Sequence, residues 1–542
     1  QLETRLRTVQ MSFNSVFLAL LGALVISGVQ GANILGIFTA PGPSHLIIEM
    51  SMAKVLAENG HNVTVVTTLK PVVTHKNITV IQVPLTAEQE KSFKNVLASI
   101  VQTDNNDVGS ALLRLRGQLT MMFEKNREVM KDPRVTGLYE NKDNKFDLVM
   151  IGYFLNNFQI GIAQKLKVPV VIASSLYQWD VFNSMLGNPA DMAYVPSMGA
   201  HFDSKGSPGF SQRFSNFVST CFEKLFIYLI EKDMAEAYNE IYGDDPNMPT
   251  YDEMNRNVSL VLFNSHAISE GPIRPNVPGV IEVGGIQIKE KPDPLPKPMA
   301  EFLNNATDGA ILLSLGSNIQ GEFLNPATVQ KMYRVLSSLK QRVIWKWEDA
   351  SNTPGDAPNI MYSKWLPQDD ILAHSKIVLF INHAGRGGIT ESQYHGKPML
   401  SLPVFGDQPG NAQKMVHDGF GLSMSLLTLE EESFRDNVRE MLENPKYTQN
   451  VRAFSELFRD RPLTARQSVL YWTEYVLRYH GAAHLQSPRL HMDFVAAHNL
   501  DVYGVLLSAL IIILFINKII LQLIYRKIVG LSKKKVTAKK TN

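Results

Sequence analysis

The sequence predicts an α/β protein made of two similar halves, followed by one membrane-spanning helix. Short β-rich segments alternate with helical patterns through most of the chain, a proline-rich segment interrupts this alternation, and a long apolar run lies near the end. Strands that are apolar on both faces and separated by helices are typical of parallel sheets. Each half is therefore expected to contain one parallel sheet covered by helices.

The first predicted strand is 33–38, which reads NILGIF. A helix should follow from Ser44, a good N-terminal cap, to Gly60, which is suited to end it. The further strands of this half are predicted at 63–67, 78–83, 146–151 and 168–174. In the second half, strands are predicted at 310–317, 342–347, 377–383 and 398–404.

The segment 284–298, GGIQIKEKPDPLPKP, contains four prolines and is predicted to link the two halves. The other boundaries follow from composition. They place upstream residues and a signal peptide at 1–31, the first half at 32–283, the second half with its C-terminal helices at 299–484, an amphipathic membrane-proximal segment at 485–501, a transmembrane helix at 502–525 and a basic tail at 526–542.

Residues 11–31 have the features of a secretory signal peptide, with an apolar core of roughly 16 residues and the small Gly31 at a plausible cleavage point. The mature chain is then expected to start near Ala32. A membrane anchor is the alternative, and it is less favoured because a buried strand is predicted at 33–38. The lone Cys221 excludes an intrachain disulfide and is expected to be a buried apolar residue.

The 24 residues of 502–525 can cross a bilayer with some tilt. The cations that follow, with no acid among them, are Arg526, Lys527, Lys533, Lys534, Lys535, Lys539 and Lys540. They favour a cytoplasmic tail, which predicts a single-pass type I membrane protein with a lumenal body. Lys539 and Lys540 resemble the dilysine retrieval signal of endoplasmic-reticulum membrane proteins, so we expect the chain in that membrane.

The charge of the chain argues against nucleic acid as a partner. The formal net charge is +2, and the basic tail supplies more than this, so the rest of the chain is net negative. Asn77, Asn257 and Asn305 stand in sequons and are expected glycosylation sites. Asn62 also stands in a sequon but opens a predicted strand. The sequence leaves open whether the protein forms a homo-oligomer.

A strand-to-helix turn at 381–391, INHAGRGGITE, combines a histidine, three glycines and a carboxylate. Gly385, Gly387 and Gly388 leave backbone N–H groups accessible at the positive end of a helix dipole, which suits a diphosphate. The turn has neither the Gly-Lys-Ser/Thr of a Walker loop nor the G-x-G-x-x-G pattern. Tight packing alone is the other explanation for glycines at such a turn.

Residues on either side of this turn could bind the rest of a nucleotide sugar. Trp365 offers a flat face to a base, Gln368 offers a hydrogen-bonding amide, and Glu391 can accept from ribose hydroxyls. Asp407 and Gln408 could bind sugar hydroxyls. Each residue could instead be structural, but their order along the chain describes a nucleotide-sugar site.

The motifs W-x-P-Q at 365–368, F-I-x-H-A-G-x-x-G-x-x-E at 380–391 and P-x-F-G-D-Q at 403–408 resemble the signature of UDP-glycosyltransferases of the glucuronosyltransferase family. The resemblance covers nearly the whole mature chain and is greatest to insect members. It implies two Rossmann-like domains facing a cleft, the GT-B type of fold. It also implies a UDP-sugar co-substrate and no metal or other cofactor, and no acidic D-x-D metal motif lies by the glycine turn.

The resemblance further implies a role for each residue of the donor site. Trp365 would stack on uracil, Gln368 would contact uracil or ribose, and Glu391 would contact the ribose. His383 and the backbone of 385–388 would contact the diphosphate, with a second phosphate contact from Ser317. Asp407 and Gln408 would contact the sugar.

His45 lies just after the first predicted strand, at the start of a helix, where it should face the crevice above the strand ends. It could deprotonate an acceptor hydroxyl there, although a capping role is the alternative. It also matches the family's catalytic histidine. Family members usually orient this histidine with a carboxylate a few residues past Phe-Asp, where this chain has Gly152. Asp147 is retained as a candidate partner, although its place in the strand resembles a structural residue of the family.

These residues predict inverting transfer of a hexose, with glucose favoured, from a UDP-sugar to a hydroxyl of a small lipophilic acceptor, as in detoxification. The acceptor pocket is expected within 85–130 and 175–245. Gly152 leaves three outcomes open: another acid serves, His45 works unassisted, or the chain is a non-catalytic protein that binds a lipophile or a UDP-sugar. If a missing carboxylate limits the enzyme, Gly152→Asp should raise its activity.

Overall fold

The computed structural model describes residues 31–102, 108–176, 178–197, 207–269 and 271–538. The predicted signal peptide, apart from Gly31, lies outside the described residues, and so do Lys539 and Lys540. The chain divides into a body that ends at Gln486 and a C-terminal unit from Ser487, which are described separately below.

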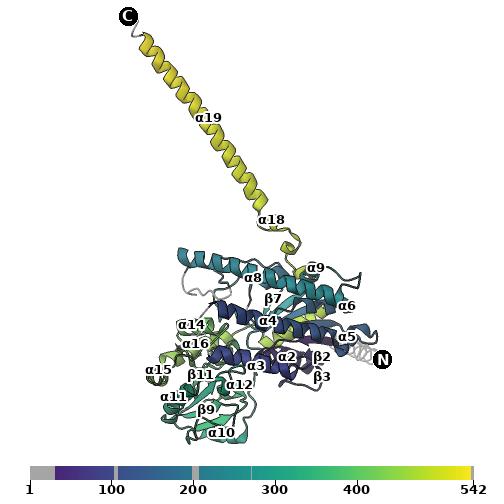
Figure 1. The fold of residues 1–542 in the computed structure, drawn as a ribbon, viewed down its shortest axis with the longest axis vertical. Coiled ribbons are helices and arrows are strands. Elements are labelled where there is room, and N and C mark those ends of the chain that lie inside the picture. Colours follow the sequence, from purple (N-terminus) through teal and green to yellow (C-terminus); the bar gives the residue numbers. More distant parts are fainter. Residues whose placement is uncertain (1–30, 103–107, 177, 198–206, 270, 539–542) are drawn as a thin grey trace, which may run out of the picture. The chain divides into compact units, whose positions relative to one another are not determined.

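The first half of the body contains a seven-stranded parallel sheet in the order β3-β2-β1-β4-β5-β6-β7. Figure 1 labels β2, β3 and β7 of this sheet. Every residue of the central strands β4 and β5 is buried, because helices cover both faces of the sheet. The strands are β1 (Asn33–Phe38), β2 (Asn62–Thr67), β3 (Ile78–Gln82), β4 (Leu148–Tyr153), β5 (Val170–Ser174), β6 (Leu260–Phe263) and β7 (Val280–Glu282). The helical elements of this half are α2 (Pro43–Glu58), α3 (Ala87–Gln102), α4 (Val108–Lys131), α5 (Pro133–Glu140), η1 (Asn157–Ile160), α6 (Gly161–Leu166), α7 (Asp180–Leu186), α8 (Phe210–Tyr242) and α9 (Tyr251–Arg256).

The second half contains a six-stranded parallel sheet in the order β10-β9-β8-β11-β12-β13. The strands are β8 (Ala310–Ser314), β9 (Arg342–Lys346), β10 (Ile360–Ser363), β11 (Ile377–Asn382), β12 (Met399–Ser401) and β13 (Gly421–Ser423). The helical elements are α10 (Lys297–Asn304), η2 (Gly321–Phe323), α11 (Pro326–Ser337), α12 (Gln368–Ala373), α13 (Arg386–His395), α14 (Gln408–His417), α15 (Glu431–Glu443), α16 (Lys446–Arg459), α17 (Ala465–Arg478) and η3 (Ala483–Leu485).

The two sheets share one topology. Counted from the first strand of each half, both contain the order 3-2-1-4-5-6, which is that of the Rossmann fold. The strand order reverses between β1 and β4 in the first sheet and between β8 and β11 in the second. Ligands of such folds bind beyond the carboxyl ends of the strands at these reversals. The prediction of two Rossmann-like halves is confirmed.

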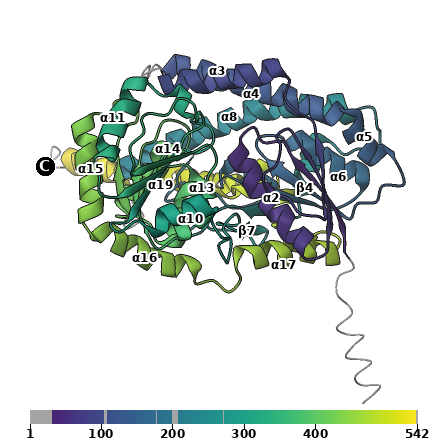
Figure 2. The same cartoon turned by 90° about the horizontal axis from the view of Figure 1, so that it is seen from below.

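Helix α17 differs from the prediction. It follows the second half in sequence but packs on α2 of the first half (Figure 2). Its Val469 and Val476 are fully buried in the same core as Leu46 of α2. The sequence placed this helix with the second half because an apolar helix face does not reveal which sheet it covers.

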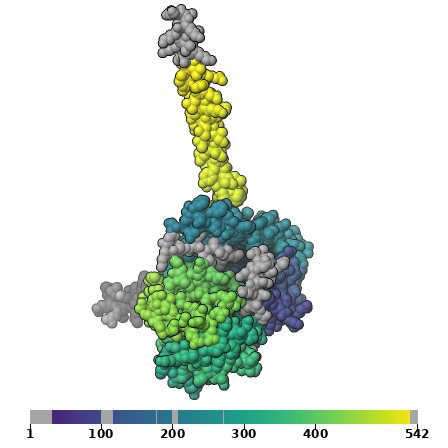
Figure 3. Space-filling view, turned by 60° about the vertical axis from the view of Figure 1, so that its left-hand side comes forward, coloured from purple at the N-terminus to yellow at the C-terminus, as the bar shows by residue number. Residues whose placement is uncertain are grey.

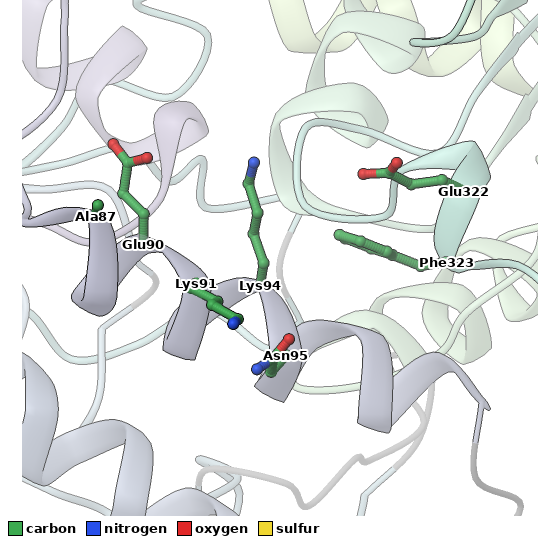
Figure 4. Close-up of a pocket in the computed structure, with 7 residues that line it drawn as sticks. All are labelled: Ala87, Glu90, Lys91, Lys94, Asn95, Glu322 and Phe323. Carbon is green, nitrogen blue, oxygen red and sulfur yellow. The ribbon is translucent and has the colours of Figure 1, made fainter.

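Helix α3 belongs to the first half in sequence but packs on the second half. Its Leu97 is buried in the core of the second half together with Phe323 of η2. Figure 4 shows the surface beside this contact, with Lys94 of α3 on one side of a small pocket and Glu322 of η2 on the other. Each half therefore contributes apolar side chains to the core of the other.

Helix α8 corrects the prediction for Cys221, which is exposed on this helix. The buried residues of α8 recur every three or four positions, as at Asn216, Thr220, Glu223 and Ile227, so one side of the helix packs on the body. Cys221 lies outside this stripe.

The C-terminal unit consists of η4 (Pro488–His491), α18 (Phe494–Ala497) and α19 (Leu500–Ala538). Among the described helices, one segment is long and apolar enough to cross a membrane, Leu500–Gly530, with a mean hydropathy of 2.6. Its apolar side chains are exposed along its length. Figure 3 draws the described part of this helix in yellow. The helix contains the predicted span at 502–525 and continues into the basic tail.

Candidate active site

A cavity of about 1450 Å³ lies in the body and is lined by residues of both halves. The segments that line it include those after β1 and β5 in the first half and those after β8 and β11 in the second. Most of the predicted site residues are among them: His45, Ser317, Trp365, Gln368, His383, Gly385, Gly387, Gly388, Glu391, Asp407 and Gln408. The topology explains this gathering, because β8 and β11 are neighbours at the switch point of their sheet.

The glycine turn leads from β11 into α13 and is held in an unusual conformation. Ala384 has φ +61°, a left-handed value that costs a non-glycine residue free energy, and its N–H donates to Asn382 Oδ1 at 2.7 Å. Gly385 is the N-cap of α13, and no side chain of the described residues caps this helix end. The first N–H groups of the helix are therefore accessible to an anion in the cavity.

Glycine is present around His383 for two different reasons. A Cβ on Gly385 would lie 2.3 Å from His383 Nε2, and one on Gly316 would lie 2.5 Å from His383 Cε1, so these two positions make room for the imidazole. A Cβ on Gly387 would meet nothing closer than 3.8 Å. Packing does not require glycine at 387, whereas close approach of a ligand to the backbone would.

His383 lies between these glycines with its Nδ1 buried and without a hydrogen-bond partner among the described residues. Burial, with a smaller contribution from the charge of Lys346, lowers the pKa of His383 to about 4. The imidazole is therefore neutral near pH 7. A neutral imidazole can donate one N–H to a phosphate oxygen without bringing a charge into the site.

Glu391 of α13 is held by amides from two directions. Its carboxylate accepts from Gln368 Nε2 at 2.7 Å and from Gln287 Nε2 at 3.4 Å. Burial, reinforced by the nearby charge of Asp369, raises the pKa of Glu391 to about 8. The sequence predicted Gln368 and Glu391 as site residues but missed Gln287, because a single glutamine in a proline-rich linker carries no local signal.

Trp365 precedes α12 and is 50% exposed, within the wall of the cavity. A half-exposed indole in a cavity offers an apolar face on which a planar base can stack.

Asp407 and Gln408 differ in how far they are available to a ligand. Asp407 is open to the cavity, and its carboxylate accepts from Asn411 Nδ2 at 2.6 Å. Gln408 is buried, and its side-chain oxygen accepts from the backbone N–H groups of Val404 at 2.8 Å and Phe405 at 3.1 Å. The oxygen of Gln408 thus shapes the turn before α14, which leaves its NH₂ group for a ligand.

His45 lies in the first turn of α2, directly after β1. Its Nδ1 lies 2.6 Å from Ser175 Oγ, and its ring meets Phe154 edge-on with centroids 5.1 Å apart. Burial lowers the pKa of His45 to about 4, so its imidazole is neutral near pH 7. Ser175, which follows β5, was not predicted from the sequence, because no motif links it to a histidine 130 residues away.

The first-half wall of the cavity is largely apolar. Its side chains come from α3, α4, α8 and the segments after β4 and β5, and they include Phe93, Leu119, Met122, Leu155, Trp179 and Phe226. Such a wall suits an apolar ligand body.

Asp147 does not reach this site. Its carboxylate accepts from the backbone N–H of Asn33 at 2.8 Å, where β1 and β4 begin. His45 follows the opposite end of β1, about 20 Å away along a six-residue strand. The interpretation of Asp147 as the partner of His45 is therefore wrong.

Two further expectations concern ions and carbohydrate. Within the described residues, no group of three or more His, Cys, Asp or Glu side chains could hold a metal ion. Asn257 and Asn305 are exposed, whereas Asn77 is half-buried and its Nδ2 donates to the backbone oxygen of Ala57 at 3.1 Å.

Comparisons with known proteins agree with this geometry. The family model described as "UDP-glucoronosyl and UDP-glucosyl transferase" matches residues 37–535. UDP-glucosyltransferase 2 of Dactylopius coccus is 32% identical, over 94% of this chain and 96% of its own. UDP-glucuronosyltransferase 2B14 of Oryctolagus cuniculus is 30% identical, over 69% of each. A solved UDP-glucosyltransferase from Polygonum tinctorium shares the fold, with a TM-score of 0.56 and 15% identity over 83% of this chain and 99% of that one. The chain belongs to the UDP-glycosyltransferase family and is an enzyme that transfers sugar from a UDP-sugar to an acceptor.

Proposed function

We propose that this enzyme transfers a hexose, with glucose favoured, from a UDP-sugar to a hydroxyl of a small lipophilic acceptor, with inversion at the anomeric carbon. The observation that carries the proposal is the cavity in which His45 and an apolar wall of the first half open toward the glycine turn of the second. Glucose is favoured because the relative from Dactylopius coccus that is 32% identical is named as a UDP-glucosyltransferase. A role in detoxification would follow from an apolar acceptor.

In the proposed reaction, the acceptor oxygen attacks the anomeric carbon as the bond from that carbon to UDP breaks. The acceptor proton passes to His45 Nε2. His45 can act in this way if Nδ1 carries the ring hydrogen and donates it to Ser175 Oγ, 2.6 Å away. Attack opposite the leaving group inverts the configuration, and UDP departs with the electrons of the broken bond.

The donor would lie along the second half. Trp365 would stack on uracil, Gln368 and Glu391 would bind uracil and ribose, and the first turn of α13 with His383 and Ser317 would hold the diphosphate. Asp407 and the NH₂ of Gln408 would bind sugar hydroxyls. Support comes from the accessible N–H groups of α13 and the neutral imidazole of His383.

Stereochemistry tests this proposal directly. Purified protein is incubated with UDP-glucose or UDP-glucuronate and a panel of phenolic acceptors, and the product is examined by proton NMR. We expect a β-glycoside from the α-linked donor, with UDP-glucose used at least tenfold more efficiently. An α-glycoside would contradict attack by an acceptor activated at His45. If neither donor is consumed, the protein would be one that binds these ligands without transferring the sugar.

We further propose that the chain resides in the endoplasmic-reticulum membrane with its body in the lumen, and that Lys539 and Lys540 retrieve it. Lys539→Ser with Lys540→Ser should release the protein to later compartments, because the tail keeps enough positive charge to hold the orientation. The matched control is Lys534→Ser with Lys535→Ser, which removes equal charge nearer the span. Imaging of both variants, tagged in the body, decides the question: a reticular pattern for both would place retention elsewhere.

Lumenal residence would also expose the sequons to glycosylation. Asn305 is the favoured site because it is exposed. Asn257 is exposed too, but its Nδ2 donates to Gln164 Oε1 at 3.4 Å, and the half-buried Asn77 would have to give up its bond to Ala57.

A further inference from the structure

The side chain of Glu49 occupies an unusual place in the first half. It lies on α2, four residues after His45, and is completely buried. Neither of its carboxyl oxygens accepts a hydrogen bond from any residue that the structure describes. A buried carboxyl without partners destabilises a fold, so its presence calls for a reason other than packing.

Gly152 provides the space for this carboxyl group. A Cβ at position 152 would lie 2.5 Å from Glu49 Cδ and 2.6 Å from Oε1. The register partner of Gly152 on β5 is the small Ala173, and Ser175 directly follows the end of β5. Since residues four apart lie on one side of a helix, His45 and Glu49 both point toward the strand ends where Ser175 holds the imidazole.

We infer that Glu49 is the positioning residue of His45, a carboxyl group supplied by the helix of the histidine and seated in the space above Gly152. Ser175 holds Nδ1 of the imidazole, and Glu49 acts on the ring through its charge, by stabilising the positive charge that forms on the ring during transfer. During transfer, the acceptor proton moves to His45 Nε2, and the imidazolium forms a neutral pair with Glu49 in its ionised form. Burial raises the pKa of Glu49 well above its usual value, so the ionised fraction grows as the pH is raised. No further proton transfer or co-reactant is needed. This inference rests on the proposed role of His45.

Other charged groups near α2 are engaged elsewhere. Arg466 of α17 pairs with Glu58 at the far end of α2, and Glu474 of α17 faces His61. Tyr153 of β4 belongs to the core on the opposite face of the sheet, where it packs on Phe182. Of these charged groups, Glu49 is therefore the acid whose charge can act on the His45 imidazole.

The inference reverses the expectation for Gly152→Asp. In the wild-type background, the new side chain would overlap the carboxyl of Glu49, so the variant should lose stability instead of gaining activity. The same substitution should be beneficial once Glu49 is shortened, because the carboxylate then enters the same space from the strand.

The test compares three variants of the full chain in transfer assays, with UDP binding measured on each to verify the fold. Glu49→Gln keeps the volume and removes the charge, and should lower kcat about 10–100-fold with UDP affinity unchanged. Glu49→Ala with Gly152→Asp should recover to within about fivefold of wild type. The matched control, Glu49→Ala with Gly152→Asn, differs from it by charge alone and should stay as slow as Glu49→Gln.

A purely structural role of Glu49 would make the Asp and Asn double variants equally active, and that result would overturn the inference. So would a Glu49→Gln enzyme within twofold of wild type. These failures are distinct from failure of the proposed function, which would show as an absence of transfer by the wild-type protein.

Discussion

Replacement of His45 by alanine is expected to lower kcat by about 10²–10⁴-fold, the usual contribution of a general base. UDP affinity should stay within twofold of wild type, because His45 stands in the first half and the proposed UDP contacts stand in the second. The measurement is transfer under donor saturation, with UDP binding followed by calorimetry. Loss of both properties together would point to a damaged fold.

Two controls separate the chemistry of His45 from its packing. His491→Ala removes an exposed histidine of the C-terminal unit and should leave transfer unchanged. Ser175→Ala removes the 2.6 Å partner of Nδ1 and should cost less than the loss of the imidazole itself. If His45→Ala retained transfer within threefold of wild type, another group would have to take the acceptor proton.

Glu391→Ala is expected to weaken UDP binding by about 1–3 kcal/mol, or 5–150-fold, through loss of charge-assisted hydrogen bonds to the ribose. The pH dependence sharpens this expectation. In the free protein, burial raises the pKa of Glu391 to about 8. Ribose hydroxyls donate to the ionised form, so binding favours the carboxylate, and wild-type affinity should increase as the pH is raised from 7 to 9.

The isosteric Glu391→Gln variant isolates the charge. It keeps the shape of the side chain and should lose both the affinity and its rise above pH 7. Calorimetric titration of UDP at pH 7, 8 and 9 measures both effects. An unchanged affinity in Glu391→Ala would remove Glu391 from the ribose site, and an equal rise with pH in wild type and Glu391→Gln would assign the titration to another group.

The residues that sequence reasoning identified share one property: each belongs to a local pattern. The glycine turn combines a strand end, a histidine and a helix start within eleven residues, and such a pattern fixes its own geometry. The alternation of apolar strands with helices likewise predicts parallel sheets without knowledge of long-range contacts.

The residues that it missed are defined by contacts between distant segments. Gln287 reaches Glu391 across 104 positions, and Ser175 reaches His45 across 130. Glu49 was overlooked for a different reason, since it lies close to His45 in sequence but inside an unremarkable helix. Its proposed role depends on the space above Gly152, and this space is defined only when α2 packs on the folded sheet.

The docking of α17 on α2 has a consequence for how the chain is made. The core of the first half needs Val469 and Val476, which are synthesised after the whole sheet of the second half and after helix α16. At the usual 5–20 residues per second, the 181 residues from 284 to 464 take roughly 10–40 s to translate. Throughout that interval, the apolar face of α2 that α17 will cover is open to chaperones and to other nascent chains. A chain terminated before residue 465 never closes this face, so premature stop codons late in the coding sequence should yield aggregation-prone products instead of shortened enzymes.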